Sequence, residues 1–217
     1  MAWDKTYKSE KKVWGEGPSL LAVFAYTFLS QSTRFKENKD LFILDAGCGY
    51  GRDALFLAQN LPCHILGVDN SEKAIEIAQK SVSRDLKKKV ELLCYDFSQV
   101  NDRYDIILAS NLYQILKPGE RGQLRDTIKR CSNSNSLLFL STLSVRDPHH
   151  SGKGTPIEKD PNSFMHEKYI HLSTRQELEK DFDFLNISAL FEREYIESHS
   201  SGDQHHHISW MLVGGMK

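Results

Sequence analysis

The sequence lacks an excess of charge of either sign, which argues against two kinds of partner. Its 28 lysine and arginine residues are balanced by 29 aspartate and glutamate residues, and the formal net charge is −1 at pH 7. A chain without a global positive field does not gather nucleic acid or an anionic membrane by long-range attraction. We therefore expect neither as a partner. The basic run at 87–89 is short and adjoins Glu91, which favours a solvated helix end.

Long apolar runs and paired cysteines are also missing. The longest apolar stretch, residues 20–29, is too short to span a bilayer, and the charged first residues lack the apolar region of a signal peptide. The four cysteines form no C-x-x-C pair, and none pairs with a histidine at zinc-ligand spacing. We therefore expect reduced, buried thiols, no metal site and a cytoplasmic location.

Short apolar segments alternate with helical patterns through the middle of the chain. Helices are predicted at 52–60, 71–84 and 120–131. The strands around them are predicted at 41–45, 64–69, 90–94, 104–110 and 136–143. Near-continuous apolar strands separated by helices are typical of a parallel sheet that is covered on both faces.

The C-terminal part predicts a different arrangement. Two long strands, at 184–197 and 206–214, are joined by a short polar connection, so they should pair antiparallel. The predicted fold class is therefore α/β: a Rossmann-like, doubly wound, mostly parallel sheet of seven strands with an antiparallel C-terminal strand pair.

The flanks of this core are expected to complete a single domain, 1–217. Pro18 and Ser19 predict a helix over 20–29, within an N-terminal helical cap at 1–38. The core itself is expected at 40–143. Residues 144–172 contain three prolines and four histidines, which indicates a long loop, and such loops are usually functional or disordered. We assign this loop to the acceptor, and expect a short helix from Ser173 to 181 after it.

Acidic residues stand at the ends of three predicted strands: Asp45, Asp69 and Asp96. In doubly wound sheets, ligands bind at the carboxyl ends of the strands. The first strand is followed by a glycine-rich turn that contains Gly47, Cys48, Gly49 and Gly51 and leads into a helix. Glycine lets a ligand approach the backbone, and a helix start offers free N–H groups to an anionic group. These features together predict a nucleotide-type site.

The spacing of the glycines argues against a nicotinamide cofactor. A dinucleotide site requires G-x-G-x-x-G/A, but here the third glycine comes one residue early and Arg52 follows it. Asp45 at the start of the turn would repel a pyrophosphate, whereas it suits an ammonium group. A ligand with an amino-acid tail, a ribose and an adenine fits better. A nicotinamide-dependent oxidoreductase remains a weaker alternative.

Three segments resemble motifs of class I S-adenosylmethionine-dependent methyltransferases. They read LDAGCGYGRDALFLA from residue 44, CYDF at 94–97 and YDIILASNLYQIL at 104–116. The resemblance covers about 40–145. Trp14-Gly15, Pro18-Ser19, Arg52 and the segment 169–178 are similar to the tellurite-resistance-like branch, whose members act on small molecules.

The resemblance implies roles for residues by position. The three glycines of the turn and Cys48 would support the methionine tail, and Asp45 would hold its amino group. Asp69, with Asn70 beside it, would accept the ribose hydroxyls. Asp69 before Ser71 also fits a simple helix-entry turn.

The adenine and the methyl group would lie against the next two strands. Asp96 would accept the adenine amino group, and the backbone N–H of Phe97 would face a ring nitrogen. Ser110 and Asn111 would line the floor near the sulfonium. Asp96 equally fits a solvent-facing loop.

The sequence identifies no catalytic residue. Trp14 and Tyr113 are aromatic candidates beside the sulfonium cation, or alternatively core residues. A base or metal ligands could come from the loop histidines, or these could be merely solvated; they are His149, His150, His166 and His171.

A second group of histidines, His205, His206 and His207, opens the last strand. Alternation should turn the first and third to one face and the second to the other. We expect no metal here because no acid or cysteine partner is evident.

The predicted function is methyl transfer from S-adenosylmethionine to a small-molecule acceptor. The turn Ser110-Asn111-Leu112-Tyr113 lacks the prolines of enzymes that methylate a flipped base. The alternatives are a non-catalytic cofactor-binding module and a protein or RNA methyltransferase. The oligomeric state and the acceptor atom remain open.

Overall fold

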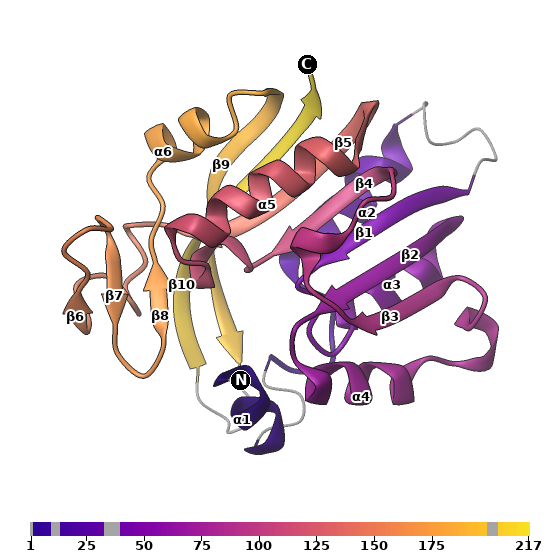
Figure 1. Ribbon diagram of the computed structural model, residues 1–217, viewed down its shortest axis with the longest axis horizontal. Helices are drawn as coiled ribbons and strands as arrows, with labels where there is room; N and C mark the ends of the chain where they lie inside the picture. The colour runs from indigo at the N-terminus through magenta and orange to yellow at the C-terminus, as the bar shows by residue number, and fades with distance from the viewer. Residues whose placement is uncertain (1, 10–13, 33–39, 199–203) are drawn as a thin grey trace.

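A seven-stranded sheet forms the centre of the chain, in the order β3-β2-β1-β4-β5-β10-β9 (Figure 1). The computed structural model describes residues 2–9, 14–32, 40–198 and 204–217. The strands are β1 (Leu41–Ala46), β2 (Cys63–Asp69), β3 (Val90–Cys94), β4 (Tyr104–Ser110), β5 (Ser132–Leu143), β9 (Leu185–Ser198) and β10 (Gln204–Met216). The first five are parallel, and β10 pairs antiparallel with both β5 and β9. The predicted fold class is confirmed.

Helices cover both faces of the sheet. They are α1 (Ala2–Ser9), α2 (Leu20–Gln31), α3 (Arg52–Asn60), α4 (Glu72–Ser81), α5 (Pro118–Cys131) and α6 (Arg175–Asp181). The segment expected as an N-terminal helical cap thus contains α1 and α2, and residues 33–38 of that cap lie outside the described residues. No described helix is long and apolar enough to cross a membrane.

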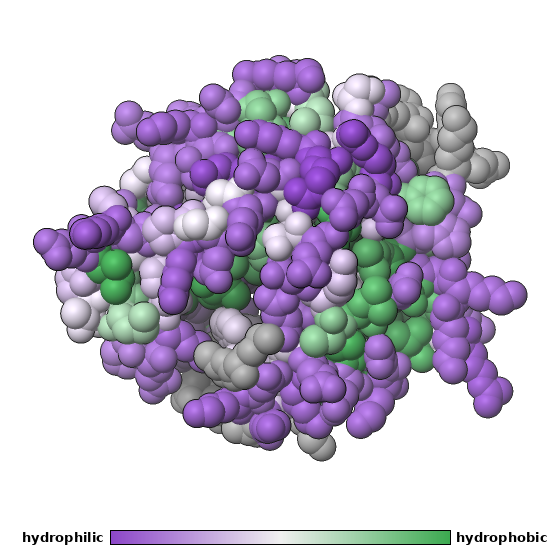
Figure 2. Space-filling view, viewed as in Figure 1, coloured by the Kyte–Doolittle hydropathy of each residue, from purple (hydrophilic) through white to green (hydrophobic). Residues whose placement is uncertain are grey.

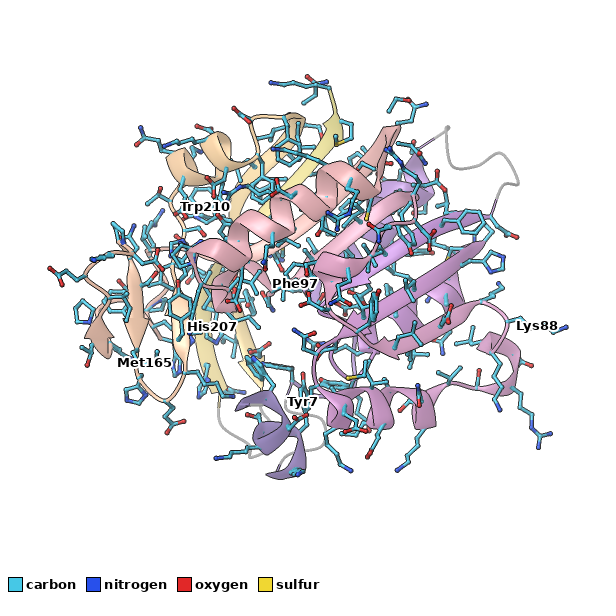
Figure 3. The ribbon with its side chains drawn as sticks, viewed as in Figure 1. Tyr7, Lys88, Phe97, Met165, His207 and Trp210 are labelled. Carbon is cyan, nitrogen blue, oxygen red and sulfur yellow. The ribbon has the colours of Figure 1, made fainter. Side chains whose placement is uncertain are left out.

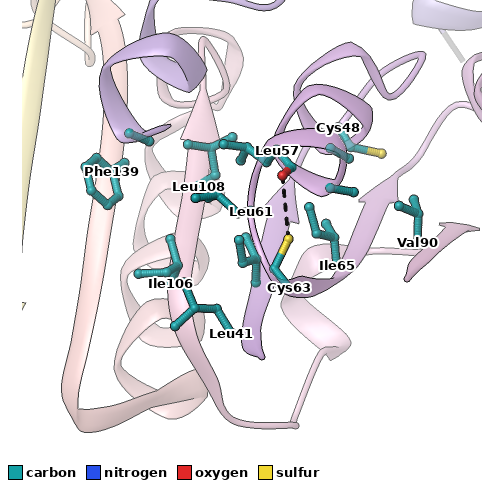
Figure 4. Close-up of a cluster of buried hydrophobic side chains, with 14 of the residues drawn as sticks. Leu41, Cys48, Leu57, Leu61, Cys63, Ile65, Val90, Ile106, Leu108 and Phe139 are labelled. Carbon is teal, nitrogen blue, oxygen red and sulfur yellow. Dashed lines mark hydrogen bonds between the residues drawn. The ribbon is translucent and has the colours of Figure 1, made fainter. Parts of the chain in front are cut away.

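Side chains of the strand β4 pack into a hydrophobic core on each face of the sheet. Ile106 and Leu108 point into a core with α2, α3 and α4, part of which Figure 4 shows. Ile107 between them points into the opposite core, which α5 and α6 complete with Leu124 and Leu178. Successive residues of a strand face opposite sides, so a continuous apolar strand requires cover on both faces. Hydrophilic side chains predominate on the face drawn in Figure 2, and a hydrophobic patch is visible among them over β1, β2 and β3.

Several element boundaries differ from the predictions by a few residues. The helix α4 ends at Ser81 instead of 84, where a short 3-10 turn (Arg84–Leu86) follows. The strand β5 begins at Ser132 instead of 136, because a bulge accommodates its polar start. There, Ser136 Oγ donates to the carbonyl of Tyr104 at 2.5 Å and accepts from Asn133 N at 2.7 Å. These bonds replace regular ladder bonds in the irregular part of the strand.

The segment 144–172, predicted as a structureless loop, contains a second sheet, so that prediction was wrong. Its strands are β6 (Thr155–Pro156), β7 (Ser163–Met165) and β8 (Tyr169–His171), paired antiparallel in this order. A buried ion pair from Arg121 in α5 to Asp160 (2.6 Å) joins this small sheet to the main domain, and Arg121 also donates to the Tyr169 hydroxyl at 2.7 Å. Strands of two or three residues are too short to produce a periodic pattern.

Candidate functional site

A cavity of about 720 Å³ lies at the carboxyl ends of the parallel strands. This is the edge where doubly wound sheets bind ligands, and the size is that of a small-molecule or cofactor site. Nine of the eleven predicted cofactor residues line it: Asp45, Gly47, Cys48, Gly49, Asp69, Asn70, Phe97, Ser110 and Asn111. Gly51 and Asp96 are not among the lining residues. Figure 3 shows Tyr7, Phe97 and His207 around the opening.

The glycine turn has a left-handed backbone at all three glycines. Gly47, Gly49 and Gly51 have φ of +73°, +54° and +77°, a region that L side chains rarely adopt. The turn is fixed to the second strand, since Gly47 N and Cys48 N both donate to Val68 O, at 2.8 and 3.0 Å. A Cβ atom on Gly47 would lie only 2.8 Å from Leu112. Gly51 instead caps the start of α3 and faces the core beside Ala78.

The Asp69 carboxylate links the glycine turn to the start of α4. Its Oδ2 accepts from Gly49 N at 2.9 Å, and its Oδ1 accepts from Ser71 N at 2.8 Å. Each carboxylate oxygen has a second lone pair, so both can still accept a hydroxyl. Burial raises the pKa of Asp69, while the two backbone bonds oppose this shift. The residue therefore makes the helix-entry turn and also lines the cavity, and its contact with the ribose hydroxyls stays a prediction.

Asp45 holds an unsatisfied carboxylate oxygen at the base of the cavity. Its side chain is 1% exposed, and Oδ2 has no hydrogen-bond partner in the described part of the chain. Burial raises its pKa well above the usual value, and the nearby carboxylates of Asp53 and Asp69 raise it further. A buried acceptor without a partner is costly. An ammonium group would supply both a donor and a positive charge, so the residue fits the amino group of an amino-acid tail.

The ends of β3 and β4 carry the other predicted residues. Asp96 Oδ1 accepts from Ser98 N at 2.8 Å and so caps a short 3-10 turn, while Phe97 lines the cavity. Ser110 Oγ donates to Ser19 Oγ at 3.1 Å. Asn111 has φ of +54°, and its backbone N–H donates to Ser141 O at 3.1 Å. A non-glycine residue in this region stores local strain, a feature that clusters at functional sites. The adenine contact of Asp96 stays a prediction.

Aromatic side chains close the cavity on the N-terminal side. Trp3 and Tyr7 of α1 pack with Trp14 and Tyr50, whose rings are stacked with centroids 6.3 Å apart. Arg52 Nη1 donates to Trp14 O at 2.6 Å and holds this segment over the glycine turn. Trp14 thus lines the cavity, whereas Tyr7 was missed. The spacing of Trp3 and Tyr7 places them on one helix face, and this pattern could have predicted an aromatic surface over the cavity.

Of the two positions that the sequence left open for Tyr113, the structure shows the core one. Its side chain is fully buried in the core with α5 and α6, and it is not a lining residue. Its hydroxyl donates to Asp181, which also accepts from Arg125 at 2.6 Å. The 3-10 turn Tyr113–Ile115 directs this ring away from the cavity and into the core with α5 and α6. The sequence pattern did not indicate this turn.

The loop histidines separate into two groups. His149, His150 and His166 line the cavity, but His171 is buried elsewhere, between Ser163 Oγ (2.8 Å) and Glu177 Oε1 (2.7 Å). His171 therefore connects β7, β8 and α6, which is neither the cavity role nor the solvated position that the sequence left open for it. Burial lowers the pKa of His150 to about 4, so this ring is neutral at neutral pH.

The histidines of the last strand alternate as predicted. His205 and His207 face the cavity, and the exposed His206 pairs with Glu194 at 2.6 Å. The expectation that no acid lies near them was wrong, because Asp147 Oδ2 is 2.9 Å from His207 Nδ1. Asp147 follows β5 and His207 opens β10, so only the antiparallel pairing of these strands joins them.

Comparisons with known proteins agree with this geometry. A family model described as a methyltransferase domain matches residues 43–135. The malonyl-[acyl-carrier protein] O-methyltransferase of Priestia megaterium is 26% identical over 138 residues, which are 62% of this chain and 49% of that protein. The chain thus spans about half the length of this curated relative.

Solved structures share the fold. A S-adenosylmethionine-dependent methyltransferase from Methanosarcina mazei superposes with a TM-score of 0.67 at 20% identity, covering 82% of this chain and 93% of that one. TehB from Haemophilus influenzae gives a TM-score of 0.65 at 14% identity, covering 90% of this chain and 61% of that one. At these identities the likeness establishes the fold. Together with the glycine turn and the strand-end acids, the match over 43–135 supports the resemblance to the class I S-adenosylmethionine-dependent methyltransferases, the family whose cofactor is S-adenosylmethionine.

Proposed function

We propose that this chain transfers the methyl group of S-adenosylmethionine to a small-molecule acceptor. The observation that carries the proposal is the orphaned Oδ2 of Asp45, buried beside a glycine turn whose backbone approaches the cavity. An ammonium is the group that this oxygen lacks, and neither a pyrophosphate nor a nicotinamide supplies one. When bound, S-adenosylmethionine supplies an activated methyl group on a sulfonium.

The residues of the cavity would act by binding and alignment. The glycine turn and Asp45 hold the amino-acid tail, and both oxygens of Asp69 remain able to accept ribose hydroxyls. The aromatic rings of Trp14 and Tyr7 stand over the same turn, where a π face favours a cation. In-line displacement on an activated donor needs mainly correct positioning and the exclusion of water.

The walls of the cavity favour a small acceptor. The helix α1 is attached to α4 through Ser71 Oγ, which donates to Asp4 at 2.6 Å. On the other side, Lys168 Nζ donates to Thr6 Oγ1 at 2.7 Å and lies 4.0 Å from the Trp3 ring centroid. The cavity is therefore bridged by α1 from α4 to the turn after β7. We accordingly propose 1–217 as one domain, with 40–143 binding the cofactor and 144–172 forming the acceptor side.

Two further parts of the proposal concern partners and location. A bridged cavity and balanced charge favour a metabolite over nucleic acid. The cysteines Cys48, Cys63, Cys94 and Cys131 are free thiols, which supports a reducing compartment such as the cytoplasm.

Calorimetry and turnover together test the function. The purified chain is titrated with S-adenosylmethionine and, separately, with NADH, and methyl transfer is then assayed on thiols, halides and oxyanions of heavier elements. We expect binding of S-adenosylmethionine alone and turnover on one of these acceptors. Binding of NADH would overturn the interpretation of the glycine turn. Binding of S-adenosylmethionine with no turnover on small acceptors, but with turnover on protein or RNA, would overturn the acceptor class.

A further inference from the structure

Four histidine rings gather on one wall of the cavity. His149 and His150 follow β5, and His205 and His207 come from β10. The ring centroids of His150 and His207 are 5.6 Å apart with an interplanar angle of 20°, and those of His149 and His205 are 3.9 Å apart. The sheet thus brings together imidazoles from two segments that are more than fifty residues apart in sequence.

A fully buried carboxylate stands at the centre of this group. Asp147 is 0% exposed, and its Oδ2 lies 2.9 Å from His207 Nδ1 and accepts from Ile208 N at 2.9 Å. Its Oδ1 accepts from the backbone N–H groups of His149 (3.1 Å) and His150 (2.8 Å). Backbone donors from both segments therefore fix the orientation of the carboxylate, so it is preorganised toward the two rings.

The spacing of these atoms is that of ligands around one ion. Asp147, His150 and His207 each offer one ligand atom, and these atoms lie within 4.8 Å of one another. Metal–nitrogen and metal–oxygen bonds are about 2.0–2.2 Å, so two ligands at right angles lie about 3 Å apart. The 2.9 Å between Asp147 Oδ2 and His207 Nδ1 matches this spacing, with a metal ion taking the place of the proton that these atoms share.

We propose that Asp147, His150 and His207 bind one divalent first-row transition-metal ion. Two imidazoles and one carboxylate are a ligand set for zinc, iron, cobalt or nickel, and they leave coordination positions open. Glu197 is the nearest candidate for the outer partner that such sites have, since its Oε2 lies 3.9 Å from the other ring nitrogen of His207 and a small shift would bring it within hydrogen-bond distance. A metal-binding histidine usually directs its second ring nitrogen to a carboxylate, which fixes its tautomer.

The open positions of the ion would face the cavity, since His150 and His207 both line it. Figure 3 shows His207 beside β10 and Phe97, which follows β3, on the other side of the opening. The role of these open positions rests on the proposed function. A small acceptor with a hydroxyl or thiol group would bind the ion there through its oxygen or sulfur atom, and the ion would lower the pKa of that group. The metal site itself does not depend on the acceptor.

The neighbouring His206 provides a matched control. It lies on the same strand, faces away from the cavity, and its ring pairs with Glu194 at 2.6 Å. A variant His206→Gln removes one imidazole from the run at 205–207 but leaves the proposed ligands in place. An exposed histidine run that merely collects metal would lose affinity in this variant.

The test titrates chelator-treated protein, without a histidine tag, with Co²⁺, and follows the visible absorption of the bound ion and the heat of binding. No S-adenosylmethionine is present, so a failure of the proposed function leaves this result unaffected. We expect one Co²⁺ per chain, affinity at least about tenfold weaker in His150→Gln and His207→Gln, and unchanged affinity in His206→Gln.

Three results would overturn the proposal: no saturable binding, unchanged affinity in His150→Gln, or an equal loss in His206→Gln and His207→Gln. His207 is 5% exposed, so its variant is also checked by thermal unfolding. His150 is only partly buried, and its variant keeps the test decisive if His207→Gln does not fold.

Discussion

Tyr7 lies directly over Gly49: a Cβ atom placed on this glycine would stand 2.9 Å from the Tyr7 hydroxyl oxygen. This contact joins the N-terminal helix α1 to the middle of the glycine turn. Two reasons therefore require glycine at position 49. Its backbone has φ of +54°, and Tyr7 fills the space that a side chain would need. The N-terminal helix is therefore part of the wall of the cavity in which we propose that the cofactor binds.

Gly49→Ala is expected to weaken S-adenosylmethionine binding by at least about tenfold. A left-handed backbone costs an L residue about 1–2 kcal/mol, and the new methyl group would also displace Tyr7. The matched control is Gly122→Ala in α5, where the nearest atom to a new Cβ is an Arg125 side-chain nitrogen at 3.8 Å. That variant should bind normally and gain up to about 1 kcal/mol in stability. Calorimetry compares the cofactor affinity of the two variants, and thermal unfolding compares their stability. Normal binding by Gly49→Ala would contradict the assignment of the glycine turn to the cofactor.

Asp69→Ala should weaken cofactor binding by about 1.5–3 kcal/mol, as for hydrogen bonds to a charged group. It removes the acceptor for Gly49 N as well as the two oxygens that face the cavity. Binding is measured by calorimetry on protein shown to be folded by thermal unfolding. The exposed Asp85 provides the control, since Asp85→Ala should bind as the unaltered chain does. Unchanged affinity in a folded Asp69→Ala variant would remove this residue from the site.

Asp45 should make the stability of the cofactor-free protein depend on pH. Burial, with Asp53 and Asp69 nearby, raises its pKa in the folded state, so the folded chain binds this proton more tightly than the unfolded chain. The free energy of unfolding should therefore fall as pH rises from the ordinary carboxyl range through the raised pKa. Asp45→Asn should flatten this decline, and the same variant should lose affinity for S-adenosylmethionine, because the ammonium loses its charged partner.

Urea unfolding at a series of pH values, without cofactor, measures this effect. Asp85→Asn, at an exposed position, should keep the slope of the unaltered chain. Identical slopes for Asp45→Asn and the unaltered chain would show that another group carries the pH dependence.

The buried pair Arg121–Asp160 should hold the acceptor side of the cavity in place. Removing one partner leaves a buried charge, so Arg121→Met should cost about 3–5 kcal/mol of stability. The double variant Arg121→Met with Asp160→Leu should recover much of that loss. Breaking the exposed pair Arg175–Glu179 should cost below about 0.5 kcal/mol. Denaturant unfolding of these three variants tests the order, and equal losses in the single and double variants at Arg121 would be inconsistent with it.

Most of the cofactor side could be predicted from the sequence. The acids at strand ends and the glycine turn follow local patterns, and the topology of a doubly wound sheet brings strand ends together. Nine of the eleven predicted residues accordingly line the cavity. Gly51 does not line the cavity because its left-handed backbone forms the start of α3. The sequence left Tyr113 open between the cavity and the core, and a short 3-10 turn rotates it into the core.

The sequence by itself determined the architecture, the parallel direction of the first five strands and the character of the glycine turn, since each depends on periodicity or on residues adjacent in the chain. Only the tertiary structure decided the acceptor side. The small sheet depends on Arg121 reaching Asp160, and the histidine cluster depends on the antiparallel pairing that brings His207 to Asp147. The residues of such a contact are far apart in the sequence, and the pattern around one does not predict the other. They become neighbours only when the sheet and its crossover connections have formed.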